Sequence, residues 1–145
     1  MFIQEPYNIN NMVVGIPRSC TVFTSRAGMK RAAIAIKNKR IDTILLTQFS
    51  NEDTVVVETR GDNTSLVLIS IYFDINRTID TDIQKIQEIL THAKGTGTIF
   101  VIDSNARSKT WHDVLTNKRG KALEEFLISR QLYIANEESY HKTFQ

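Results

Sequence analysis

The stretch Thr98-Ile99-Phe100-Val101-Ile102-Asp103-Ser104-Asn105 joins an apolar run, residues 98–102, directly to a carboxylate and an amide. A short apolar run of this kind predicts a strand that is buried on both faces. Asp103 and Asn105 then project from the strand's C-terminal end, where α/β proteins place their active sites. An aspartate there can hold a metal ion or a water, and an asparagine can orient a phosphate oxygen. Asx residues also cap ordinary turns at strand ends, so the motif alone leaves both readings open.

Two cations and an aromatic residue follow within a short loop. Arg107 and Lys109 are placed to contact a phosphate backbone, and Trp111 to stack on a nucleobase. The plainer alternative is that both cations are solvated and that the indole anchors its own loop. Tyr72 ends another apolar strand, residues 65–73, where its phenol could donate to a phosphate oxygen or simply reach solvent from the core. Together these residues favour phosphate-ester chemistry on a charged substrate.

Outward from this motif, the pattern predicts strands separated by two helices. The predicted strands are residues 2–4, 31–36, 41–49, 54–59, 65–73, 98–102 and 132–135. Residues 60–64 read as a hairpin turn, and residues 7–20 as a loop. Thr78 is placed to cap a helix that Gly95 and Gly97 stop, and a second helix spans residues 118–130. This order predicts an α/β fold, a two-sheet mixed β sandwich flanked by helices.

The composition predicts one soluble, intracellular domain. The length of 145 residues suits a single core, and 41% hydrophobic with 23% charged residues is ordinary for a globular protein. One cysteine, Cys20, excludes an internal disulfide framework and favours a reducing compartment, nuclear or cytoplasmic. No membrane-length run or signal peptide is visible, so a membrane partner is not expected, and no obligate protein partner is inferred.

The charge is unevenly distributed along the chain. Residues 1–40 carry seven basic side chains against one acid, Glu5, whereas the remainder carries eleven basic against fifteen acidic ones. A basic N-terminal third is compatible with a polyanionic partner, although a solvated basic surface has the same composition.

Glu5 follows the first strand just as Asp103 follows a later one. Two carboxylates at equivalent strand ends can meet over one edge of a sheet. Such an oxygen-rich site suits Mg²⁺, which takes one or two carboxylates and keeps waters and substrate phosphate in its other positions. Taken alone, a glutamate at this position is more often an exposed strand-end residue.

Three segments together resemble the endonuclease/exonuclease/phosphatase superfamily. They are Phe2-Ile3-Gln4-Glu5-Pro6-Tyr7, Ser70-Ile71-Tyr72-Phe73, and Val101-Ile102-Asp103-Ser104-Asn105-Ala106-Arg107-Ser108 with Trp111. Within it, the chain is most similar to the apurinic-type endonuclease domain of insect non-long-terminal-repeat retrotransposons. Shorter stretches at Arg31-Ala32-Ala33-Ile34, at residues 120–126 and at Thr143-Phe144 also resemble that family. The resemblance runs over nearly the whole chain, in order and in spacing.

The resemblance implies a role for each matching position. Glu5 would bind Mg²⁺, Tyr72 would contact the scissile phosphate, and Asp103 would orient or deprotonate the attacking water. Asn105 would position the phosphate, while Arg107, Lys109 and Trp111 fall in the loop that approaches DNA. The implied reaction is Mg²⁺-dependent hydrolysis that nicks one strand of target DNA and primes reverse transcription.

The family pattern also contains parts that do not match these 145 residues. It has an earlier strand with an asparagine and later aspartate and histidine positions, and His141 does not align with that histidine. We therefore expect residues 1–145 to form a single partial endonuclease domain, incomplete at both termini and nearly inactive alone. Two alternatives stay open at this point: a non-catalytic nucleic-acid-binding or interaction module, and a phosphatase for lipid head groups.

Overall fold

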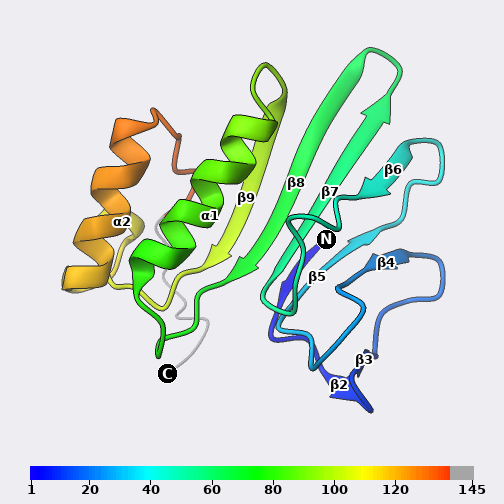
Figure 1. The fold of residues 1–145 in the computed structure, drawn as a ribbon, viewed down its shortest axis with the longest axis horizontal. Helices are drawn as coiled ribbons and strands as arrows, with labels where there is room; N and C mark the ends of the chain where they lie inside the picture. Colours follow the sequence, from blue (N-terminus) through cyan, green and yellow to red (C-terminus); the bar gives the residue numbers. More distant parts are fainter. Residues whose placement is uncertain (138–145) are drawn as a thin grey trace.

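A four-stranded sheet forms the centre of the computed structural model, which describes residues 1–137 (Figure 1). Its strand order is β6 (Asp42–Leu45), β7 (Thr54–Gly61), β8 (Thr64–Tyr72) and β9 (Gly97–Asp103). The β7–β8 pair is a hairpin whose turn is Asp62-Asn63, and Asn63 has a φ of 84°. β8 and β9 run parallel, so both strands end at the same edge of the sheet.

A smaller sheet packs against one face of this central sheet. Its order is β1 (Phe2–Gln4), β5 (Ala32–Ile36) and β4 (Thr21–Phe23), all antiparallel. Ala32 and Ile34 of β5 bury against Val55 and Val57 of β7. The two sheets therefore form a sandwich with an apolar interface.

Two helices cover the opposite face of the central sheet. They are α1 (Ile79–His92) and α2 (Lys118–Ser129), and a short 3₁₀ helix, η1 (Lys109–Trp111), precedes α2. Side chains of alternate strand positions, such as Ile69, Ile71 and Phe73, pack with Ile86 and Leu123 in the larger core. The predicted sandwich flanked by helices is confirmed.

Several local predictions are also confirmed, some with shifted bounds. Helix α1 begins after Thr78, whose hydroxyl contacts Thr81 Oγ1 at 3.2 Å instead of capping a backbone amide. The helix ends at His92; Gly95, with a φ of 82°, lies in the turn that follows, and Gly97 already belongs to β9. The strand predicted for residues 41–49 covers only β6, because residues 47–49 turn.

The loop predicted for residues 7–20 is wrong in part. It contains a small hairpin, β2 (Asn8–Ile9) with β3 (Met12–Val13). Asn10 and Asn11 form its two-residue turn with φ values of 50° and 61°, a left-handed conformation that asparagine tolerates. The short strand β4 was also not predicted, because three residues are too few to show an alternating pattern.

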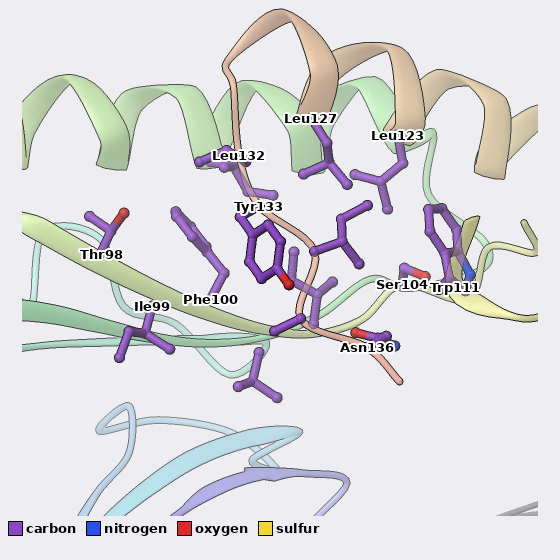
Figure 2. Close-up of a pocket in the computed structure, with 15 residues that line it drawn as sticks. Thr98, Ile99, Phe100, Ser104, Trp111, Leu123, Leu127, Leu132, Tyr133 and Asn136 are labelled. Atoms are coloured by element: carbon purple, nitrogen blue, oxygen red, sulfur yellow. The ribbon is translucent and has the colours of Figure 1, made fainter. Parts of the chain in front are cut away.

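The strand predicted for residues 132–135 is wrong, and so is the complete burial of residues 98–102. The Leu132 amide donates to Leu127 O at 2.9 Å after Gln131 turns left-handed, so this backbone caps α2 instead of pairing with a strand. Among the described residues β9 pairs only with β8, and Ile99 is 43% exposed. Residues 132–135 run beside β9, and their side chains line a cavity of about 750 Å³ together with Phe100 and Leu127 (Figure 2).

Candidate active site

Tyr72 and Asp103 lie side by side at the C-terminal ends of β8 and β9. They are directly paired in the parallel register, and paired residues direct their side chains to the same face of a sheet. Phe73 N donates to Asp103 O at 2.8 Å, which holds the two strand ends together. A phenol and a carboxylate are thereby brought to one point.

The strand β1 brings Glu5 to the same end of the sandwich. Gln4 Nε2 donates to Ser70 Oγ at 3.0 Å and to Val101 O at 3.1 Å, and Ser70 Oγ donates to Ile3 O at 3.1 Å. Ser70 and Val101 stand two positions before Tyr72 and Asp103, on the same face. Glu5, the residue directly after β1, is exposed beyond this contact.

Asn105 forms the turn that closes the end of β9. It has a φ of 44°, and its Nδ2 donates to Phe73 O at 2.8 Å, so the amide ties the turn to the end of β8. This is the capping arrangement expected of an Asx residue at a strand end. It also fixes the amide beside the Tyr72–Asp103 pair, because Phe73 directly follows Tyr72.

A single arginine of α2 holds the loop that contains Asn105. Arg119 Nε donates to Asn105 O at 3.2 Å, and its Nη1 donates to Arg77 O at 2.7 Å. Its Nη2 lies 3.4 Å from both Asp74 O and Ser104 O. One guanidinium therefore joins the turn after β8 to the turn after β9.

A cluster of charged residues lies around the ends of β5, β7 and β8; we call it the arginine–aspartate cluster. Its members are Arg31, Asp53, Asp74, Arg77 and Asp82. Asp53 is the centre of the cluster, because its carboxylate accepts from Arg31 Nε at 2.5 Å and from Arg77 Nη1 at 3.0 Å. The Arg31 guanidinium also lies 4.9 Å from the centre of the Tyr72 ring.

The cluster shifts the pKa values of its acids in opposite directions. The backbone amide of Asn76 and then the Arg31 guanidinium lower the pKa of Asp74. Burial raises the pKa of Asp82 against the pull of Arg77, and Asp82 Oδ2 has no hydrogen-bond partner among the described residues. Hydrogen bonding to Asp53 raises the pKa of Arg31 above its ordinary value, so Arg31 stays charged.

The loop after β9 is held mainly by its own contacts. Arg107 pairs with Asp113 at 2.9 Å, and the Trp111 indole donates to Ala106 O at 3.1 Å while packing against the larger core. Lys109 is exposed. The indole thus anchors the loop, and contact of Arg107, Lys109 and Trp111 with DNA stays a prediction.

The described histidines are engaged away from Asp103. The ring of His92 lies 5.0 Å from that of Phe49, and His112 Nε2 lies 3.4 Å from Asn136 O. His141 is outside the described residues. The apolar cavity of Figure 2 is also separate from the candidate site, because its lining includes none of Glu5, Tyr72 and Asp103.

The carboxylates present fit a magnesium ion that keeps most of its waters. Within residues 1–137, no three His, Cys, Asp or Glu side chains are grouped closely enough to enclose a metal ion. Mg²⁺ does not need such a cage, since one or two carboxylates with waters and substrate phosphates hold it. Glu5 and Asp103 provide carboxylates of that kind at one end of the sandwich.

Sequence reasoning missed the roles of Arg31, Asp53, Asp74 and Arg119 around this site. The first three had a detectable signal. Arg31 is the first residue of the strand predicted for residues 31–36, Asp53 directly precedes the one predicted for residues 54–59, and Asp74 directly follows the one predicted for residues 65–73. In an antiparallel pair the start of one strand meets the end of its neighbour, which gathers these charges at one edge. Arg119 had no comparable signal, because its contacts are with backbone carbonyls.

The model of the endonuclease-reverse transcriptase family matches residues 66–145, more than half of the chain. The chain belongs to this family. A solved member of similar fold, the endonuclease domain of TRAS1, a telomere-specific non-LTR retrotransposon, is 30% identical with a TM-score of 0.81. That match covers 94% of this chain and 60% of the solved one. The predicted resemblance to retrotransposon endonucleases is confirmed.

Two curated relatives carry similar sequences within much longer proteins. The retrovirus-related Pol polyprotein from type-1 retrotransposable element R1 of Bradysia coprophila is 27% identical over 91% of this chain. The putative 115 kDa protein in the R1DM element of Drosophila melanogaster is 23% identical over 98% of it. The chain spans 14% of the length of each relative. Neither α1 nor α2, the α-helices of the described residues, is long and apolar enough to cross a membrane.

Proposed function

We propose that residues 1–145 contribute the phosphate-binding and metal-binding half of an endonuclease site that nicks one strand of target DNA to prime reverse transcription. The observation that carries the proposal is the register pairing of Tyr72 with Asp103, beside strand β1, which ends at Gln4 directly before Glu5. Membership of the endonuclease-reverse transcriptase family supports the same chemistry.

Each residue has a role that its position permits. The Tyr72 phenol donates to a non-bridging oxygen of the scissile phosphate, and Asp103 accepts a hydrogen from the attacking water and orients it. Asn105 is fixed at the turn, so its amide meets the phosphate without losing freedom on binding. Glu5 and Asp103 would hold Mg²⁺, which supplies charge neutralisation for the developing phosphorane.

The DNA contacts extend along the loop after β9. Arg107 and Lys109 contact backbone phosphates on either side of the cut, and Trp111 sets the shape of the loop that carries them. The basic side chains of the N-terminal third lie in the loops between and after strands β1 to β5, and they attract the polyanion. We place the reaction in the nucleus or cytoplasm, where a single free cysteine stays reduced.

We expect the 145 residues alone, one partial endonuclease domain, to nick DNA weakly or not at all. The described histidines, His92 and His112, are engaged elsewhere, so no histidine among residues 1–137 is placed beside Asp103 as an acid–base group. Loss of such a group costs about 10² to 10⁴ in rate. The decisive assay therefore uses this chain continued into its flanking coding sequence, next to the chain alone.

Nicking of supercoiled plasmid in Mg²⁺ tests the proposal. Asp103→Ala should lower the nicking rate by about 10² to 10⁴. Asp62→Ala is the matched control, because Asp62 is an exposed aspartate in the turn at the other end of β8. An extended protein that retains DNA without nicking it would show that this chain is a binding module. Nicking that survives Asp103→Ala would show that Asp103 has no role in the reaction.

A further inference from the structure

Arg31 touches two predicted site residues that come from different sheets. Its backbone O accepts a hydrogen bond from Glu5 N at 2.9 Å, and its guanidinium lies over the Tyr72 ring, 4.9 Å from the ring centre. Glu5 follows a strand of the small sheet, whereas Tyr72 ends a strand of the central sheet. One residue therefore spans the gap across which the metal-binding and phosphate-binding groups must be aligned.

The Arg31 side chain is itself held in a single orientation. Nε and Nη2 donate to the two carboxylate oxygens of Asp53 at 2.5 and 2.7 Å, and Nη1 donates to Asp74 Oδ2 at 2.8 Å. The Asp53 side chain is only 5% exposed and is held further by Arg77. A planar fork bound on two edges cannot rotate, so its flat face is fixed against the phenol ring.

Asp53 completes a closed path from the arginine back to the tyrosine. Its backbone O accepts from Tyr72 N at 2.8 Å, while its carboxylate holds the guanidinium that covers the Tyr72 ring. The strand end and the ring of Tyr72 are thus fixed by the same pair of residues. Free rotation of the phenol would give up the contact with the fixed guanidinium over its face.

The charge balance argues against a direct phosphate-binding role for Arg31. Two aspartates face its single positive charge, and its side chain is 27% exposed. A phosphate arriving at this guanidinium would meet the negative charges of Asp53 and Asp74 at contact distance. The arginine is therefore neutralised within the protein and acts on its neighbours.

We propose that Arg31, locked by Asp53 and Asp74, is a positioning residue that sets the Tyr72 phenol and the Glu5 strand end in register with each other. The proposal rests on the nicking function proposed above. It assigns Arg31 no contact with the reacting atoms. Its effect should therefore fall on turnover, and DNA binding should be retained.

The first test compares two arginines of the same cluster in the extended protein. Arg31→Lys keeps the charge and loses the two-edged fork; we expect kcat for nicking to fall about 10²-fold with KM unchanged. Arg77→Lys is the matched control, because Arg77 also pairs with Asp53, while its other side-chain bonds within residues 1–137 go to Asp82 and not to Tyr72 or Glu5. Equal losses for both variants would overturn the proposal, since that result means a general loss of fold.

A double-variant cycle tests whether Arg31 acts through Tyr72. Combining Arg31→Lys with Tyr72→Phe should lower kcat by less than the product of the two single effects, because both changes disturb one arrangement. Independent, multiplying effects would overturn the proposal.

A measurement without catalysis separates this inference from the proposed function. In the 145-residue chain labelled with 3-fluorotyrosine, ¹⁹F NMR follows ring motion, and the Tyr72 signal is assigned by its loss in Tyr72→Phe. Arg31→Lys should let the Tyr72 ring flip freely and average its signals, whereas Arg77→Lys should not. If the extended wild-type protein does not nick DNA yet this difference is seen in the 145-residue chain, the nuclease proposal fails and the positioning role stands. A Tyr72 ring that is equally mobile in all variants overturns the positioning role.

Discussion

The two faces of the sheet β6-β7-β8-β9 differ in chemistry although they come from the same strands. On the helix side, Ile69, Ile71 and Phe73 are fully buried in a wholly apolar core. On the side of the small sheet, the apolar contact of β5 with β7 gives way toward the end of β8 to Ser70 and Tyr72, which lead into hydrogen bonds and charges; we call this the polar face. The apolar face provides the free energy that holds the strands, and the polar face uses their fixed ends to place reactive groups.

The largest expected effect is on the helix side. Phe73→Ala should lower the free energy of unfolding by about 3–5 kcal/mol, because it leaves a cavity in the larger core. Urea denaturation followed by circular dichroism measures this change. Tyr72→Phe is the neighbouring control: it removes one hydroxyl on the other face and should leave stability almost unchanged. A greater loss of stability in Tyr72→Phe would break the comparison between the faces.

A second change tests the link between the helix layer and the site loop. Gly120→Ala would place a Cβ 1.8 Å from Arg107 O, so either α2 or the loop must move. Overpacking of this kind lowers the free energy of unfolding by about 1–3 kcal/mol. We expect a loss at the upper end, because the new Cβ meets a backbone carbonyl, which cannot move aside as a side chain can. Differential scanning calorimetry gives the change, with Lys121→Ala on the exposed side of α2 as control. A Gly120→Ala protein of unchanged stability would show that the loop yields freely.

The polar face should respond less strongly. Ser70→Ala removes a buried hydroxyl that donates to Ile3 O and accepts from Gln4, so β1 loses a tie to the central sheet. We expect a loss of about 1.5 kcal/mol in unfolding free energy, with faster hydrogen exchange at β1 amides. Ser65→Ala, an exposed position at the start of the same strand, should show neither change. Unaltered exchange in β1 would mean that other contacts hold this strand.

The smallest effect is the pH dependence contributed by Asp74. Its pKa lies below the ordinary value of 3.8 in the folded protein, so its carboxylate contributes stability above that pH and loses it on acidification. Asp74→Asn should therefore flatten the fall in stability between about pH 5 and pH 2. Acid titrations at fixed urea compare the variant with Asp62→Asn at the hairpin tip. A variant curve parallel to that of wild type would contradict the assigned shift.

The local sequence pattern was sufficient to predict the longer strands and the two α-helices. The hairpin of β7 and β8 and both helices follow from alternation, turn residues and helical spacing within one segment. The same reasoning failed for residues 132–135, where four apolar residues read as a strand but the backbone caps α2 instead. A short apolar run does not indicate whether its backbone amides will donate to an adjacent strand or to the carbonyls at the end of a helix.

The candidate site divides in the same way. Glu5, Tyr72, Asp103 and Asn105 could be named from the sequence because each polar residue follows an apolar strand and matches a family motif. Arg31, Asp53 and Arg119 were found only in the structure. Their side-chain partners lie 14 to 45 positions away in sequence, among them Asn105 and Asp74 for Arg119 and Asp53 for Arg31. Contacts between residues so far apart leave no repeating pattern in the local sequence.

The sequence by itself determined the longer strands, both α-helices and the type of chemistry expected at the strand ends, because these depend on residues a few positions apart. Only the tertiary structure decided how that chemistry is aligned. The parallel register sets Tyr72 beside Asp103, and the Ser70–Gln4 contact brings β1 and Glu5 to them. Arg31, fixed by two aspartates, then lies between the sheets, since a charge there is stable only where the fold supplies its counter-charges.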